Sequence, residues 1–189
     1  MHPILFQIGE FKVYSYGFAI LIAFLVGVYL ARRRAKRYGL TPQQITDASF
    51  AILLLGIIGA RVVFILQSLE YYRQNPQELW TLQFRGLTSF GGLIFGFFAA
   101  WGFAWRAKKP LLALLDTAAV PVLIGHAIGR VGCLLNGCCY GGVCDLPWGI
   151  HVEGYSELHH PAQIYDSLML VAGADRKSTR LNSSHLGIS

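Results

Sequence analysis

Charged residues are scarce in this sequence of 189 residues. They make up 14% of the chain, whereas about 25% is usual in soluble globular domains. This shortage excludes a cytosolic enzyme with an ordinary solvated surface. The 54% of hydrophobic residues also excludes a disordered chain, because disordered segments are poor in apolar residues and rich in charge. The composition indicates a protein whose outer surface faces lipid.

Several common catalytic motifs are also missing. The sequence has no P-loop, no G-x-G-x-x-G pattern and no Ser-His-Asp signature, so it does not predict the nucleotide-binding or hydrolase sites that these motifs mark. We expect neither a cofactor nor a metal.

The formal net charge of +6 suggests a nucleic-acid partner at first sight. The basic residues, however, lie in short blocks beside apolar runs. Blocks in that position orient a membrane protein in the bilayer. We therefore expect a lipid bilayer as partner and no nucleic acid.

Four segments are long and apolar enough to be membrane spans, since a helix needs about 20 residues to cross a ~30 Å hydrocarbon core. They are 13–31, 48–69, 86–105 and 111–132, and a fifth apolar segment begins near Pro161 and is cut off at residue 174. The sequence therefore predicts an all-α fold, a polytopic bundle of transmembrane helices.

Lys and Arg in the connecting segments indicate the orientation, because they concentrate in short cytoplasmic loops. Eight follow the first and third spans, three lie on the opposite side, and none lies between Cys133 and Pro161. The N-terminus and the loops 70–85 and 133–161 are therefore predicted to face outward. The eight are Arg32, Arg33, Arg34, Lys36, Arg37, Arg106, Lys108 and Lys109, and the three are Lys12, Arg73 and Arg85.

The composition changes abruptly at Asp175. From there the chain reads DRKSTRLNSSHLGIS, which is polar, rich in serine and aperiodic. We interpret 175–189 as a non-native, disordered tail joined to a truncated transmembrane domain, 1–174. A natural soluble tail is the alternative.

Two arginines are predicted to lie within spans near the outward side. A charged side chain in lipid is a functional-site hypothesis by default, and Arg61 and Arg130 approach the same leaflet. Two guanidinium groups at that depth repel each other unless an anion bridges them, and phosphate suits their geometry. The alternative is that each side chain reaches the interface as an anchor.

The context of Arg130 is HAIGRVGCLLNGCCYGG. His126 lies four residues before it, on the same helix face, and could be a general base or a hydrogen-bonded structural residue. Gly129 and Gly132 remove bulk beside the arginine, so that a ligand or a backbone can approach.

Small and aromatic residues mark the outer ends of two other spans. Gly92 and Gly96 have the spacing of close helix packing, while Gly91 and Gly92 could instead break the helix and expose backbone N–H groups to a head group. Tyr14 and Tyr16 indicate an interfacial aromatic belt first and ligand hydroxyls second.

Four cysteines lie in the outward loop. Disulfides are the first interpretation in an oxidising compartment, and at least one is expected, although not between the adjacent pair. A zinc site comes second because no paired C-x-x-C spacing supports it, and a catalytic thiol comes third. The residues are Cys133, Cys138, Cys139 and Cys144.

The run GRVGCLLNGCCYG, from Gly129 to Gly141, resembles the signature of the prolipoprotein diacylglyceryl transferase family, roughly G-R-x-G-N-F-x-N-G-E-x-x-G. Cys133 stands at the position of the signature Asn and Cys138 at that of the Glu, as in a cysteine-containing branch. Further matches occur in order along 1–174. They are Tyr16–Gly17, Gly59-Ala60-Arg61, Gly91–Gly92, Asp116 with Pro121, and the run His160-Pro161-Ala162-Gln163-Ile164-Tyr165.

The resemblance implies a seven-span bundle in the bacterial inner membrane, with its active site facing the outer leaflet. The implied reaction transfers diacylglycerol from phosphatidylglycerol to the thiol of a lipobox cysteine in prolipoprotein signal peptides, and glycerol phosphate leaves. The family's phosphatidylglycerol-binding Arg falls on Arg130, whereas a His of some members falls on Phe90. Later spans with another important Arg would lie beyond Ala174, so this chain alone is expected to be inactive.

Two other classes remain open, an anion transporter lined by arginines and a thiol-redox membrane protein. The identity of the base stays open as well. The candidate catalytic residues are His126, His160 and Tyr16, and the candidate substrate-binding residues are Arg130, Arg61, Gly91, Gly92 and Asn136.

Overall fold

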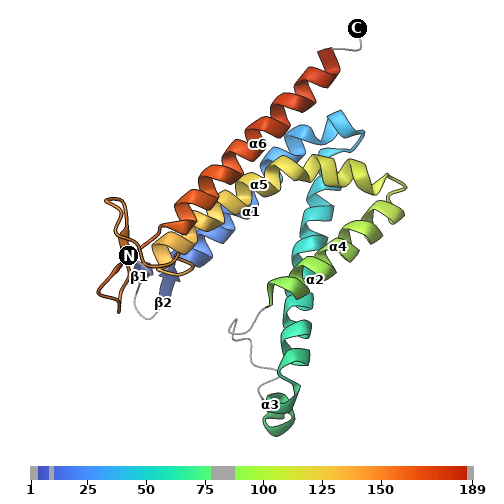
Figure 1. Ribbon diagram of the computed structural model, residues 1–189. Coiled ribbons are helices and arrows are strands. Elements are labelled where there is room, and N and C mark those ends of the chain that lie inside the picture. The colour runs from blue at the N-terminus through green and yellow to red at the C-terminus, as the bar shows by residue number, and fades with distance from the viewer. Residues whose placement is uncertain (1–3, 9–10, 78–87, 187–189) are drawn as a thin grey trace. The chain divides into compact units, whose positions relative to one another are not determined.

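The computed structural model describes residues 4–8, 11–77 and 88–186, and it is predominantly helical, as predicted (Figure 1). Arg85 and the start of the span predicted at 86 lie outside the described residues. The long helices are α1 (Ser15–Arg34), α2 (Pro42–Gln67), α4 (Ser89–Arg106), α5 (Leu111–Asn136) and α6 (Ala162–Leu186). The short elements are η1 (Ala35–Tyr38), α3 (Leu69–Gln74) and the strands β1 (Ile4–Ile8), β2 (Phe11–Tyr14), β3 (Ile150–His151) and β4 (Leu158–His159).

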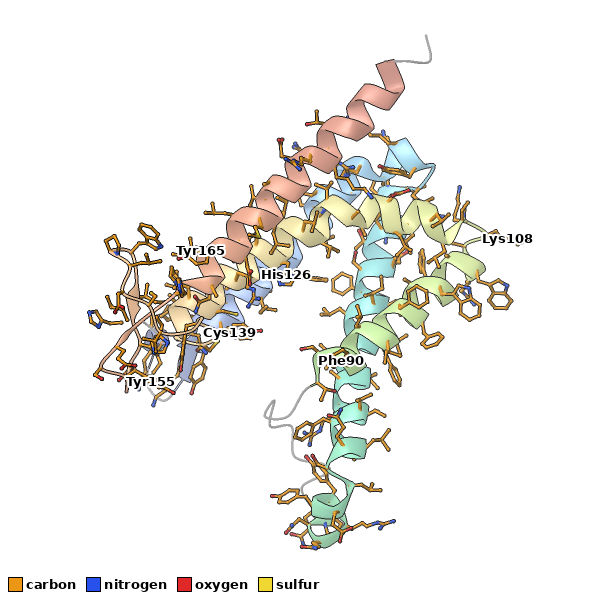
Figure 2. All side chains as sticks on the ribbon, in the orientation of Figure 1. Phe90, Lys108, His126, Cys139, Tyr155 and Tyr165 are labelled. Atoms are coloured by element: carbon orange, nitrogen blue, oxygen red, sulfur yellow. The ribbon has the colours of Figure 1, made fainter. Side chains whose placement is uncertain are left out.

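Three of the described helices are long and apolar enough to cross a membrane: 15–38, 42–67 and 111–136. The helix predicted over 86–105 is present as α4 from Ser89, but it is not one of these three. Large apolar side chains stay exposed on the helix surfaces, among them Phe90 (74%) and Trp105 (81%) (Figure 2). Such a surface fits lipid rather than water as its solvent.

The chain forms two compact units, and each is described by itself. One consists of 1–31 and 117–189, and the other of 32–116. The candidate site residues are divided between the units: Arg61, Gly91 and Gly92 belong to 32–116, and all the others belong to the first.

In the unit 32–116, α2 and α4 pack closely because glycines face each other. A side chain on Gly91 would meet the carbonyl oxygen of Gly59 and, at 2.8 Å, Cβ of Val63. A side chain on Gly59 would in turn meet the ring of Phe95. The start of α4 is also hydrogen-bonded to α2, because the hydroxyl of its N-cap residue Thr88 donates to the Ala60 carbonyl at 3.2 Å.

In the other unit, α1, α5 and α6 lie side by side (Figure 1). Small residues of α5 face α1: a side chain on Gly125 would meet the Ala23 carbonyl at 3.3 Å, and one on Gly132 would meet Cβ of Ala19 at 2.5 Å. On the other side of α5, the Ser167 hydroxyl of α6 donates to the Ala127 carbonyl at 3.2 Å. Close approach of small residues and interhelical hydrogen bonds are what associates helices in lipid.

Two short antiparallel strand pairs were not predicted. β1 pairs with β2 before α1, and β3 pairs with β4 in the segment between α5 and α6. The second pair is extended by backbone hydrogen bonds from Cys144 N to Leu158 O at 2.8 Å and from Gly141 N to His160 O at 2.9 Å. These bonds fold the segment 137–161 back toward the start of α6.

Helix α6 continues through the junction at Asp175 and ends at Leu186, so the prediction of a disordered tail is wrong for 175–186. Helix nucleation is unfavourable, but each residue added to an existing helix gains a hydrogen bond. The apolar segment 162–174 provides that nucleus. Beyond it, Asp175, Arg176 and Thr179 are exposed, and the Thr179 hydroxyl donates to the Asp175 carbonyl at 3.0 Å.

Candidate active site between α5 and α6

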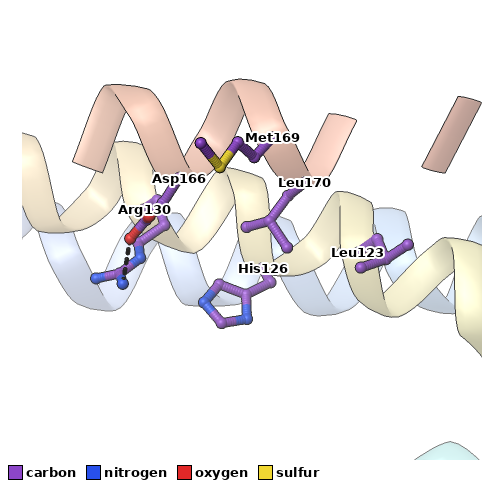
Figure 3. A pocket seen from close by; sticks show the side chains of 6 residues that line it. All are labelled: Leu123, His126, Arg130, Asp166, Met169 and Leu170. Carbon is purple, nitrogen blue, oxygen red and sulfur yellow. Dashed lines mark ion pairs between the residues drawn. The ribbon is translucent and has the colours of Figure 1, made fainter. Parts of the chain in front are cut away.

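An open pocket of about 330 Å³ lies between α5 and α6. Each helix lines it with one face: the residues of α5 follow one another at intervals of three and four, and the two apolar residues of α6 lie three and four positions after its carboxylate, spacings that share a helix face. The apolar lining surrounds three polar side chains. The residues are Leu123, His126 and Arg130 of α5 and Asp166, Met169 and Leu170 of α6 (Figure 3).

Arg130 and Asp166 form an ion pair across this pocket. Nη2 of the guanidinium lies 2.5 Å from Oδ2 of the carboxylate, and the two side chains are 28% and 40% exposed. In lipid an unpaired guanidinium would be expensive, and a neighbouring carboxylate is the usual compensation. The pairing therefore compensates the charge of Arg130 and leaves its side chain partly exposed at the pocket.

The ion pair leaves most of the guanidinium donors unused. An arginine has five N–H donors in a fixed fork, and the ion pair engages Nη2. Nε is buried and has no hydrogen-bond partner among the described residues. The Nη donors that Asp166 does not engage are the ones left for a further partner, and phosphate is an anion that fits such a fork in a bidentate manner.

His126 lies one helical turn before Arg130, as predicted, and points into the same pocket (Figure 3). Its side chain is exposed and makes no hydrogen bond to any residue in the described part of the chain. The alternative of a hydrogen-bonded structural histidine is therefore not supported.

His160 does not line this pocket. Its Nδ1 lies 3.4 Å from the hydroxyl of Tyr165, which also accepts a 2.8 Å hydrogen bond from Trp148 Nε1. The His160 backbone N donates to Gly142 O at 3.0 Å. These contacts anchor the segment 137–161 to α6, so the structure gives His160 a structural setting.

Tyr16 lies at the start of α1, beside Gly132. A side chain on Gly132 would lie 3.7 Å from Cδ2 of Tyr16, and one on Gly129 would lie 3.7 Å from Ile20 Cδ1. Side chains of α1 therefore occupy the space beside Gly129 and Gly132, where the sequence analysis expected a ligand or a backbone to approach. Tyr16 itself is 43% exposed and does not line the pocket.

Asn136 is the last residue of α5 and precedes the cysteine turn. The four cysteines are free, so the expected disulfide is not present. The Sγ atoms of Cys138 and Cys139 lie 3.5 Å apart, far from the ~2.05 Å of a disulfide bond. The Cys139 thiol donates to the Cys138 sulfur, and this hydrogen bond together with burial raises the pKa of Cys139 above its usual value.

The candidates in the unit 32–116 make packing contacts. The Arg61 guanidinium lies over the ring of Tyr72, 5.7 Å from its centroid, which makes it a structural cation–π partner. Gly91 and Gly92 lie in the first turn of α4 and do not interrupt it, since Gly92 N donates to Thr88 O at 3.2 Å. The alternative of a helix break at this glycine pair is therefore not supported.

Asp166 is the site residue that the sequence analysis missed. It lies in the apolar helix that begins after Pro161, so the rule that selected Arg61 and Arg130 applies to it equally. Its position one turn into α6 would have identified it as a carboxylate near the outward end of a span.

Apolar helices with exposed apolar surfaces, and a charged pair between two of them, define an integral membrane protein. The model of one family, described as prolipoprotein diacylglyceryl transferase, matches residues 3–174. The chain belongs to this family. The match ends at the residue where the sequence analysis ends the transmembrane domain.

Curated relatives carry the name phosphatidylglycerol–prolipoprotein diacylglyceryl transferase. The chain is 31% identical to the protein of Clostridium tetani over 89% of its own length and 69% of the relative's. It is 34% identical to that of Geobacter sulfurreducens over 88% and 66%, and 32% identical to that of Fusobacterium nucleatum over 90% and 59%. The chain thus spans about two thirds of the length of these relatives, and their names favour the transferase over a transporter or a redox protein.

Proposed function

We propose that this chain takes part in transferring the diacylglyceryl group of phosphatidylglycerol to the lipobox cysteine thiol of prolipoproteins. One observation carries the proposal: the Arg130 guanidinium, paired with Asp166, borders an open pocket between apolar helices. In a chain of this family, that is where a phosphate group with two apolar chains is expected to bind.

In the proposed reaction the peptide sulfur attacks the glyceryl carbon that carries the phosphate. The C–S bond forms, the C–O bond breaks, and the electron pair leaves with glycerol phosphate. Arg130 stabilises the phosphate oxygens on which negative charge develops. The apolar lining from Leu123, Met169 and Leu170 suits the acyl chains next to the head group.

The thiol has to lose its proton, because the thiolate is the nucleophile. Among the candidate bases, His126 borders the pocket, whereas His160 is engaged with Tyr165. We therefore assign the base role to His126 and a structural role to His160. Tyr16 and Asn136 remain candidates for contacts with the substrate outside the pocket lining.

The protein is proposed to lie in the bacterial inner membrane with this site at the outer leaflet. The two basic loops are the basis for the orientation, and they meet within the unit 32–116, where Lys109 Nζ donates to Gly39 O at 2.7 Å. Loops that contact each other lie on one side of the bilayer, which supports their common cytoplasmic placement.

The test uses a chimera in which residues 1–174 are followed by the remainder of the Geobacter sulfurreducens relative, assayed for diacylglyceryl transfer to a lipobox peptide. Arg130→Ala should reduce kcat by about 10²–10³, as loss of one charge-stabilising donor typically does. Arg130→Lys should also lose activity, because an ammonium lacks the planar fork. Arg73→Ala, at an exposed arginine of α3, is the control, and wild-type turnover of Arg130→Ala would reject the assignment.

A further inference from the structure

Three cysteine sulfurs meet at the carboxyl end of α5, outside the pocket described above. Cys133, Cys138 and Cys139 each offer one sulfur, and the three sulfurs lie within 4.8 Å of one another. Cys144, the fourth cysteine, does not belong to this cluster and is buried separately.

The way the helix ends explains the convergence. Gly137, at φ +74°, closes the helix: Cys138 N donates to Cys133 O at 3.1 Å, and Gly137 N donates to Leu134 O at 3.2 Å. This is the hydrogen-bond pattern of a Schellman motif, in which the two residues of the outer bond bring their side chains together. Here both side chains are thiols.

Cys139 completes the cluster at a conformational cost. Its φ of +65° is left-handed, which costs a residue with a Cβ about 1–2 kcal/mol, and strain of this kind gathers at functional sites. The turn is also fixed from α6, because the Gln163 amide, only 1% exposed, donates to Cys138 O at 2.6 Å.

We propose that Cys133, Cys138 and Cys139 form a three-thiolate site for a soft d¹⁰ cation, with Zn²⁺ as the ion it takes. With Zn–S bonds of about 2.3 Å, the sulfurs of a tetrahedral site are about 3.8 Å apart. That spacing lies between the 3.5 Å that separates the Cys138 and Cys139 sulfurs and the 4.8 Å that bounds the whole cluster. Three thiolates and Zn²⁺ leave one negative charge. Arg130 lies one turn before Cys133 on the same helix and acts electrostatically on Cys139, so it attracts that charge although it is also paired with Asp166. Cu⁺ would leave two negative charges.

The exposure of the three cysteines indicates where the metal ion enters the site and where its fourth ligand binds. Cys139 is exposed while Cys133 is buried, so an ion enters from the Cys139 side and a water or thiol completes the tetrahedron there. Binding displaces the thiol protons, and the affinity therefore rises with pH. Tyr16 of α1 and Arg130 of α5 are the ionisable groups that act on the cluster.

The experiment uses the full 189-residue chain in detergent micelles, reduced, stripped with a chelator and titrated with Zn²⁺ against a competing chelator. We expect one Zn²⁺ per chain. Cys133→Ser, Cys138→Ser and Cys139→Ser should each weaken Kd by about 100-fold, at least as much as loss of an outer-shell partner does. Cys144→Ser is the matched control and should bind like the wild type.

A second measurement uses the unmutated chain, so that a folding defect in a variant cannot mimic the result. Zn²⁺ should protect the three cluster thiols from alkylation, as read by mass spectrometry, and leave labelling of Cys144 unchanged. Equal zinc affinity of the wild type and a triple Ser variant, or no protection in the wild type, would overturn the proposal. Tighter binding of Cu⁺ than Zn²⁺ under reducing conditions would overturn the choice of ion.

Discussion

Arg130 shows how a single charge is accommodated between apolar helices. Its partner Asp166 comes from a helix 36 positions further along the chain, and the pair is only partly exposed. A carboxylate in this position both compensates the charge of the guanidinium and orients it, so we expect Asp166 to be a positioning residue for the phosphate that Arg130 is proposed to bind.

The coupling of this pair can be measured in the chimera by a double-mutant cycle with Arg130→Ala and Asp166→Ala. We expect an interaction energy of about 0.5–3 kcal/mol in transition-state binding, as for residues in direct contact. Asp166→Asn should lower activity by about tenfold, since the guanidinium loses its orienting charge. Strictly additive effects in the cycle would show that the pair does not act as a unit.

Cys139 provides a prediction about pH. Its pKa is raised above the ordinary 9.0, first by the hydrogen bond to Cys138 and then by burial, while Arg130 opposes the shift. A raised pKa keeps the thiol protonated through neutral pH, so its alkylation in metal-free protein should be slow at pH 7 and still increase above pH 9. A rate that levels off below pH 8 would contradict this sign.

At the scale of single residues, the sequence predicted which residues share a helix face, but it did not predict which side chains they contact. Spacing alone placed His126 and Arg130 on one helix face, because a turn of helix is a local property. The ion pair with Asp166 depends on how two helices pack, and the cation–π contact of Arg61 depends on where α3 lies. Neither is encoded in a local pattern.

At the scale of elements, glycine contacts decide how the helices pack. In α4, Gly91 has no room for a side chain: a Cβ there would meet Val63 Cβ at 2.8 Å and Ala60 Cα at 2.9 Å. Gly102 of the same helix has nothing within 4 Å of that position. The two glycines therefore form a matched pair for substitution.

Gly91→Ala should destabilise the chain by about 1–3 kcal/mol, because overpacking a close interface forces backbone shifts. Gly102→Ala should be neutral or stabilising by up to about 1 kcal/mol, because alanine is the better helix former. Unfolding in mixed micelles followed by circular dichroism measures both. An equal loss in the two variants would indicate a general effect of removing glycine rather than the α2–α4 contact.

Element ends were harder to predict than the elements themselves. Apolar runs located all five long helices, but the end of α6 was misplaced because a polar composition does not prevent a helix from being continued once it is nucleated. The cysteine turn was misjudged for a related reason. Spacing shows how far apart two cysteines are in the chain, whereas the left-handed Gly137 and Cys139 determine which sulfurs meet.

At the scale of the whole molecule, the distribution of basic residues carries the prediction of orientation. A green fluorescent protein fused after Lys109 should fluoresce, because it stays in the cytoplasm, and an alkaline phosphatase fused after Gly154 should be active, because it is exported. Exchanging the two reporters gives the control, in which both signals should be lost. The opposite pattern would invert the assigned orientation and place Arg130 at the inner leaflet.

The hydrogen bond from Gln163 to the Cys138 carbonyl has a consequence for biosynthesis. Its partners are 25 residues apart in the chain, and at about 5–20 residues per second the ribosome needs roughly 1–5 s to add the second after the first. During that interval nothing from α6 holds the turn, and its thiols are open to oxidants and isomerases. The order of synthesis therefore gives a short period in which the cysteines of this turn can be oxidised before Gln163 fixes its backbone.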